Sequence, residues 1–112
     1  MKRTKSIKLN KDFKRLYYRG KSAVRSNVVA YVMKNRTNEN HLGLTCGKSI
    51  GKAVKRNRVK RLMREGYRLL EDKLLVGFDI VLVARTRCIS CKQKHVLKDL
   101  ESCFDSLGIL KK

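Results

Sequence analysis

The sequence is short of acidic residues and has no proline. Nine aspartates and glutamates stand against 29 lysines and arginines, which gives a formal net charge of +20 over 112 residues. A chain with so little negative charge repels itself unless a polyanion neutralises it, and nucleic acid is the polyanion we expect. An anionic membrane is the alternative, but the most basic segment lacks the bulky aromatic face of an interfacial helix. We therefore expect no membrane partner.

The chain also lacks an apolar run long enough to cross a membrane. Its first residues, MKRTKSIKLN, are basic, but they are not followed by the apolar segment of a secretory signal. Four cysteines without an export signal indicate reduced thiols, so we expect a cytoplasmic protein. No linker or internal repeat divides the chain, which predicts a single domain over residues 1–112, with residues 1–8 as a basic flexible arm.

Clusters of carboxylates and histidines that could serve catalysis are missing from the sequence. The acidic residues are scattered without a D-x-D or H-E-x-x-H arrangement, and neither His41 nor His95 has an obvious triad partner. A protein nuclease would need metal-binding acids or a histidine base. The sequence therefore predicts a protein that assists catalysis and does not itself supply an acid or a base.

Three of the four cysteines lie near the C-terminal end. Cys88 and Cys91 form a C-x-x-C pair, His95 follows four residues later, and Cys103 lies further along the same predicted helix. The spacing could form half of a zinc site, but the sequence has no second C-x-x-C pair. The apolar stripe of the helix already accounts for Cys103. We therefore expect ordinary thiols and no metal ion bound by the protein.

The most basic stretch runs from Lys48 to Arg68 and predicts an amphipathic helix. At 3.6 residues per turn it separates into a cationic arc and an apolar arc. The apolar arc consists of Val59, Leu62, Met63, Gly66, Leu69 and Leu70. Cations in the first turns of a helix cost about 0.3–1 kcal/mol each, unless phosphates occupy that end. The pattern indicates one face in a core and the other on the backbone of RNA or DNA.

A shorter helix is predicted over residues 11–19, with Asn10 as its N-cap. Phe13 and Tyr17 lie four residues apart on this helix, and Lys14 lies beside them. Rings interleaved with cations suit unpaired bases, which stack on the rings while the cations hold the backbone. Aromatic residues at helical spacing are also common in cores. The residues alone leave both interpretations open.

Apolar segments predict strands over residues 23–33, 42–47 and 78–85. The last is apolar almost throughout, which is typical of a central strand covered on both faces. A capping box from Ser90 to Gln93 predicts a final helix that ends near Leu107 and packs on the sheet. The order helix–strands–helix–strand–helix predicts an α+β fold, a single-domain α–β sandwich.

The basic stretch also resembles a known family. The segments Gly51-Lys52-Ala53-Val54, Arg56-Asn57-Arg58, Lys60-Arg61 and Arg64-Glu65 are similar to the signature of the bacterial ribonuclease P protein subunit. The resemblance covers residues 9–107 and is weakest over residues 87–93. It implies a fold shared with a ribosomal protein domain, including a left-handed βαβ crossover. Crossovers of this kind are otherwise right-handed almost without exception.

The resemblance implies partners and site residues as well. In the family, an RNA subunit acting with Mg²⁺ is the catalyst that removes the 5′ leader of precursor tRNA, and the protein binds both RNAs. The residues implied to contact the catalytic RNA are Lys52, Lys55, Arg56, Asn57, Arg58, Lys60, Arg61, Arg64 and Arg68. Those implied to hold the leader are Phe13, Lys14, Tyr17 and Tyr31.

Two other functions compete with this one. A structural RNA-binding protein of the ribosomal type would share the charge and the fold, but it would need no aromatic cleft. A DNA-binding helix is weaker, because apart from its arginines and Asn57 the basic segment has few side chains suited to reading base edges. We expect no DNA partner. Leader release by a catalytic RNA at low Mg²⁺, with and without the protein, would separate the first two functions.

Overall fold

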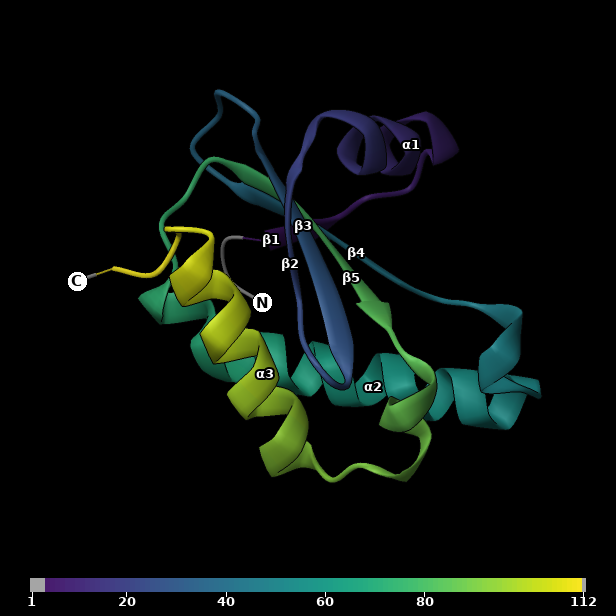
Figure 1. The fold of residues 1–112 in the computed structure, drawn as a ribbon. Helices are drawn as coiled ribbons and strands as arrows, with labels where there is room; N and C mark the ends of the chain where they lie inside the picture. Colours follow the sequence, from purple (N-terminus) through teal and green to yellow (C-terminus); the bar gives the residue numbers. More distant parts are fainter. Residues whose placement is uncertain (1–3, 112) are drawn as a thin grey trace.

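A computed structural model describes residues 4–111, which form a mixed β-sheet and three α-helices (Figure 1). The elements are β1 Thr4–Ser6, α1 Asn10–Arg19, β2 Lys21–Val24, β3 Val28–Lys34, β4 Asn40–Cys46, α2 Ala53–Leu70, β5 Phe78–Ala84 and α3 Gln93–Ser106. Short 3₁₀ turns lie at Lys48–Ile50, Glu71–Lys73 and Thr86–Ser90. The predicted α+β class and the predicted order of elements from the first helix onward are confirmed. Within residues 4–111, no helix has the length and apolarity needed to span a bilayer.

The sheet separates two layers of helices. Its strands run in the order β1-β4-β5-β3-β2, with β1, β4 and β5 parallel and with β3 antiparallel to both β5 and β2. α2 and α3 pack together against one face, and α1 lies across the other face (Figure 1). Ile80 and Leu82 of β5 belong to the core beneath α2 and α3, whereas Val81 faces α1. β5 is therefore the central strand covered on both faces that its composition predicts.

The apolar arc of α2 forms much of the core. Val59, Met63 and Leu70 are buried as predicted, but Leu69 is 53% exposed, so its assignment to the core was wrong. Consecutive residues lie about 100° apart around a helix, which turns Leu69 away from the line through Met63 and Leu70. Tyr67 is fully buried in its stead, and its ring meets the ring of Phe104 on α3 edge-on at 6.3 Å.

The first strand corrects the expectation of a flexible arm over residues 1–8. Thr4–Ser6 pairs in parallel with β4, where Thr4 lies opposite Asn40. The Thr4 hydroxyl is 2.8 Å from the Tyr67 hydroxyl and donates to the Glu71 carboxylate. These contacts tie the strand to the end of α2. The first three residues of the predicted arm lie outside the described residues.

The strand predicted over residues 23–33 is a hairpin of two strands, β2 and β3. The chain reverses at Arg25-Ser26-Asn27, where the Arg25 amide donates to the Val28 carbonyl at 2.9 Å. The backbone N–H of Asn27 donates to the carboxylate of Asp99 on α3 at 2.9 Å. The apolar residues on either side continue the same alternation, so the sequence pattern hides the turn.

The capping box predicted from Ser90 to Gln93 was also wrong. A 3₁₀ turn occupies Thr86–Ser90, and α3 begins later, with Lys92 as its N-cap residue. His95 supplies the cap, because its Nδ1 accepts a hydrogen bond from the Lys92 amide at 3.1 Å. At the other predicted cap, α1 already includes Asn10 and has Leu9 in the N-cap position.

A polar cluster joins the first residues of β4 and β5. His41 Nδ1 lies 2.7 Å from Asp79 Oδ1, and its Nε2 lies 3.2 Å from Glu39 Oε1. The hydrogen bond with Asp79 is the main reason that the pKa of His41 is raised above its ordinary value of 6.5, and burial partly opposes the rise. Protonated His41 therefore stabilises the fold below pH 6.5, and this contribution is lost as the pH rises through the raised pKa.

We expect His41→Gln to remove part of the pH dependence of stability. The melting temperature of the unmodified chain should be higher at about pH 6 than at about pH 8, and this difference should shrink in the variant. Thermal unfolding followed by circular dichroism measures both values. His95→Gln, which changes the other histidine, is the control and should keep the difference. A His41→Gln protein with the full pH difference would contradict the role of this pair.

Candidate nucleic-acid interface

The outward face of α2 carries the predicted cationic surface. Its members Lys52, Lys55, Arg56, Asn57, Arg61, Arg64 and Arg68 are exposed, and Lys60 and Arg58 are half-buried. The helix begins where Gly51 takes a φ of 111° and Lys52 is extended, and its first turn contains no acidic residue. Cations and free helix-end amides thus meet at one place, which is an arrangement that favours a bound phosphate.

The charge of this face has little compensation from acidic side chains. Among residues 4–111, the one ion pair that these cations make joins Arg68 to Glu65 at 3.0 Å. Nearer the start of the helix a shallow hollow is lined by Val54, Asn57, Arg58, Lys60, Arg61 and Arg64. The hollow offers several donors and no acid to an anionic ligand.

Arg58 differs from the neighbouring cations because its side chain makes structural hydrogen bonds within the protein. Its guanidinium donates to the Ile89 carbonyl at 2.8 Å and to the Cys91 carbonyl at 3.0 Å. These bonds fasten the connection between β5 and α3 to the side of α2. In the sequence Arg58 is one more cation of the motif, since the two carbonyls lie more than thirty positions further along the chain.

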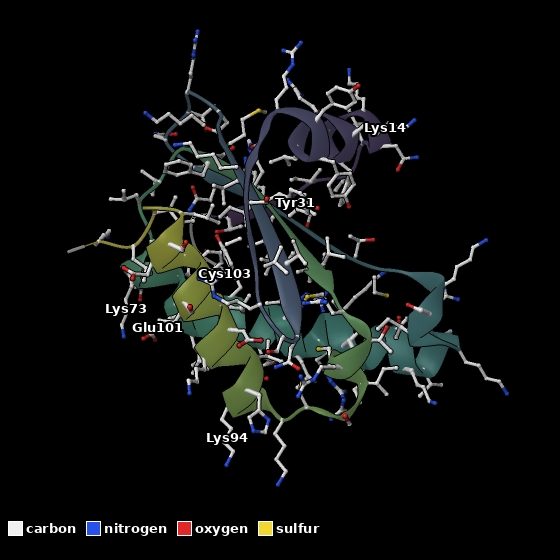
Figure 2. All side chains as sticks on the ribbon, in the orientation of Figure 1. Lys14, Tyr31, Lys73, Lys94, Glu101 and Cys103 are labelled. Atoms are coloured by element: carbon white, nitrogen blue, oxygen red, sulfur yellow. The ribbon has the colours of Figure 1, made fainter. Side chains whose placement is uncertain are left out.

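The second predicted site lies across the sheet, beneath and beside α1. Leu16 is the α1 residue that is fully buried, whereas Tyr17 is 43% exposed and Phe13 is half-buried. Tyr31 lies on β3 and is labelled in Figure 2. Its ring meets that of Tyr17 edge-on, with the ring centroids 4.9 Å apart. The three rings therefore lie at the surface of the layer and are not enclosed in it.

A small pocket opens beside these rings, between α1 and β4. It is lined by Asn10, Phe13, Lys14, Tyr17, Leu44 and Thr45. Gly43 permits this arrangement, because a Cβ at that position would come within 2.7 Å of the Phe13 ring. We call this pocket, together with Tyr31, the aromatic cleft. Leu44 and Thr45 were missed from the sequence, although their position after Gly43 on a predicted strand was a usable signal.

β4 connects the aromatic cleft to the cationic face of α2. Leu44 and Thr45 line the cleft, and the strand then leads through the turn at Lys48–Ile50 to the start of α2 (Figure 1). The Ser49 hydroxyl lies 3.3 Å from that of Thr86, which joins this turn to the segment that Arg58 fastens. The chain thus runs directly from the lining of the cleft to the first turn of α2.

The cysteine cluster is buried beside α2. Cys88 and Cys91 are free thiols whose sulfur atoms lie 3.5 Å apart, and burial raises the pKa of Cys88 to about 12. Burial likewise raises the pKa of Cys103 to about 11. His95 is exposed and accepts from the Lys92 amide. No group of three or more His, Cys, Asp or Glu side chains within residues 4–111 is placed to hold a metal ion.

Comparison with known proteins gives a consistent result. The model of the ribonuclease P family matches residues 1–108. The ribonuclease P protein component of Clostridium botulinum (strain Loch Maree / Type A3) is 46% identical over 107 residues, which cover 95% of this chain and 91% of that protein. That of Clostridioides difficile (strain 630) is 38% identical over 101 residues, 89% of each chain.

Solved structures of such proteins have the same fold. The RNase P protein of Staphylococcus aureus is similar with a TM-score of 0.84 at 28% identity, covering 95% of this chain and 97% of that one. That of Thermotoga maritima gives a TM-score of 0.79 at 28% identity, with 88% and 93% covered. The predicted α–β sandwich is confirmed, and the parallel β4–α2–β5 crossover is consistent with the left-handed connection that the resemblance implies.

Substitution can distinguish the structural role of Arg58 from the exposed position of the other cations on α2. Arg58→Ala would leave two half-buried carbonyls without donors, and each such loss costs about 1–3 kcal/mol of unfolding free energy. Arg56→Ala, at an exposed position one turn earlier than Lys60, should change the unfolding free energy by less than about 0.5 kcal/mol. Urea unfolding of the two variants without RNA measures the difference. Equal stability of the two variants would contradict a structural role for Arg58.

Proposed function

Because the chain belongs to the bacterial ribonuclease P protein family, we propose that it binds two RNAs side by side. The catalytic RNA of ribonuclease P lies along the cationic face of α2, and the 5′ leader of precursor tRNA lies in the aromatic cleft. The holoenzyme is an endoribonuclease that removes this leader and so produces the mature 5′ end of the tRNA. The observation that carries the proposal is the half-exposed aromatic cleft, which β4 connects to an uncompensated cationic helix.

The catalytic RNA fits α2 because of how its charges are placed. The first turns carry cations and no acid, an arrangement that is unfavourable in an isolated helix. Phosphates remove this cost and release counterions when they bind. The RNA-binding side chains on α2 are Lys52, Lys55, Arg56, Asn57, Lys60, Arg61, Arg64 and Arg68. Arg58 supports this surface from its edge, with its remaining N–H groups available to a phosphate.

The leader fits the cleft because it is single-stranded. Unpaired bases can stack on Phe13, Tyr17 and Tyr31, and the ammonium group of Lys14 can hold a phosphate at the rim. Stacking depends on the flat face that every base has, so this cleft would accept leaders of many sequences. A structural RNA-binding protein of the ribosomal type would give these half-exposed rings no role.

Catalysis in this proposal belongs to the RNA subunit, with Mg²⁺ held mainly by RNA. The protein contributes binding energy and charge. The catalytic RNA and its substrate are both polyanions that repel each other, and a domain of net charge +20 between them reduces that repulsion. The protein thereby raises the affinity for substrates that have a leader. In this proposal the protein acts in the cytoplasm, as a single RNA-binding domain.

The aromatic cleft is tested by truncating its rings. With saturating RNA subunit, Phe13→Ala and Tyr17→Ala should each weaken the binding of precursor tRNA by about 1–3 kcal/mol, the value of one base stacked on a ring. Binding of mature tRNA should hardly change, because it has no leader. Equilibrium dissociation constants for the two ligands measure the effect. Tyr17→Phe, which keeps the ring, should bind precursor tRNA nearly as well as the unmodified protein.

Leu16 provides the matched control on the same helix. It is fully buried, so Leu16→Ala should cost about 2–5 kcal/mol of stability and act equally on both ligands. If Phe13→Ala and Tyr17→Ala behaved like Leu16→Ala, with a large fall in melting temperature and no preference for precursor tRNA, the rings would belong to the core. The leader-binding role would then have to be abandoned.

A further inference from the structure

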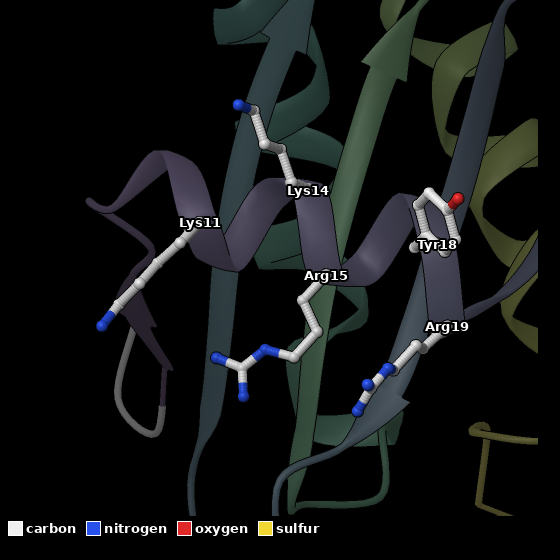
Figure 3. Close-up of a pocket in the computed structure, with 5 residues that line it drawn as sticks. All are labelled: Lys11, Lys14, Arg15, Tyr18 and Arg19. Carbon is white, nitrogen blue, oxygen red and sulfur yellow. The ribbon is translucent and has the colours of Figure 1, made fainter.

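The outer face of α1 carries a second cationic surface, which shares Lys14 with the aromatic cleft. It is formed by Lys11, Lys14, Arg15, Tyr18 and Arg19, which line a shallow hollow (Figure 3). In Figure 3, Lys11, Arg15 and Arg19 project to one side of the helix, while Lys14 and Tyr18 lie toward the other. We call these five residues the outer α1 surface.

Tyr18 is the unusual member of this surface. Its side chain is 93% exposed, more than any other large apolar or aromatic side chain within residues 4–111. The ring contributes nothing to the core, since Leu16 fills that role for α1. Flat rings kept in water among cations are typical of surfaces that bind single-stranded nucleic acid.

The charges of the outer α1 surface are largely uncompensated. Asp12 is the one acidic residue of α1, and its carboxylate pairs with Arg15. Among the described residues, Lys11, Lys14 and Arg19 make no ion pair with an acid. A simple solvated helix face usually mixes both signs of charge. A polyanion therefore complements this surface better than a protein or an apolar partner would.

Lys14 makes the outer α1 surface continuous with the aromatic cleft. It lines both hollows, at the ridge between them. Tyr17 and Tyr18 are consecutive, so their side chains leave the helix about 100° apart, one toward the cleft and one toward the outer face. A strand that stacks on Tyr17 and passes Lys14 would meet Tyr18 next.

We propose that the 5′ leader continues out of the cleft and over the outer α1 surface. A base distal from the cleavage site stacks on Tyr18, and the phosphates on either side of it contact Lys11 and Arg19. This inference rests on the proposed function, because it requires the leader to occupy the cleft first. It predicts that the protein distinguishes leaders by length as well as by their presence.

The test compares two precursor tRNAs in the reconstituted holoenzyme. One has a short leader that fills only the cleft, and the other has a long leader that extends past it. Tyr18→Ala should weaken binding of the long-leader substrate about fivefold or more, which corresponds to about 1 kcal/mol for one stacked base. Binding of the short-leader substrate should be unchanged. Tyr18→Phe keeps the stacking face and should restore long-leader binding.

A second comparison tests the cations of the outer α1 surface with two double variants that remove the same number of positive charges. The double variant Lys11→Ala/Arg19→Ala should weaken long-leader binding and lower its log–log salt slope by about 0.7 for each phosphate that the protein no longer neutralises. The control, Lys94→Ala/Lys98→Ala, removes the same charge from α3, which lies across the sheet from α1 (Figure 2). The control should affect neither leader. Equal effects of the two double variants would reduce the outer α1 surface to a contribution to net charge and overturn the proposal.

The outcomes also separate this inference from the proposed function. Phe13→Ala must weaken short-leader binding if the cleft holds the leader at all, whereas Tyr18→Ala must not. If Tyr18→Ala weakened both leaders equally, weakened neither, or instead lowered the affinity for the RNA subunit measured without tRNA, the outer path would be wrong. The cleft would stand in each case if Phe13→Ala kept its effect.

Discussion

The packing of α2 against the sheet and α3 decides where the charge of this protein lies. One side of the helix is buried, at Val59, Met63, Tyr67 and Leu70. The cations on the opposite side therefore face solvent. The same packing lets Arg58 reach the carbonyls of Ile89 and Cys91, so the shape of the cationic face depends on the core. A chain of net charge +20 thus holds many cations in a fixed array, ready for a polyanion.

The sheet connects the cationic face of α2 with the aromatic cleft. β4 contributes residues to the aromatic cleft and then leads directly to the start of α2. Gly43 allows Phe13 to lie close over the strand, and Leu16 anchors α1 so that Tyr17 can remain half in water. Both proposed binding sites are therefore positioned by elements of one sheet, an arrangement that would favour a defined distance between catalytic RNA and leader.

The parts of the fold and of the candidate site that could be predicted are those where one hydrophobic pattern dominates the sequence. The amphipathic pattern of α2, the apolar run of β5 and the family signature indicated the helix, the central strand and the cationic face. β1 was missed because a strand of three residues is too short to show a hydrophobic alternation. Its position also depends on the contact of Thr4 with Tyr67, which lies far along the chain. The choice between cleft and core for Tyr17, and the structural bonds of Arg58, depend on residues distant in sequence. No local pattern encodes them.

Site-specific photocrosslinking in the complex of protein, RNA subunit and precursor tRNA tests the central claim most directly. A photoreactive side chain would replace Tyr17 in one variant and Arg61 in another, and the crosslinked nucleotides would be mapped. The account predicts leader nucleotides at position 17 and nucleotides of the RNA subunit at position 61. Crosslinks from position 17 only to the RNA subunit or the tRNA body, or leader crosslinks from position 61 instead, would contradict the assignment of the two faces.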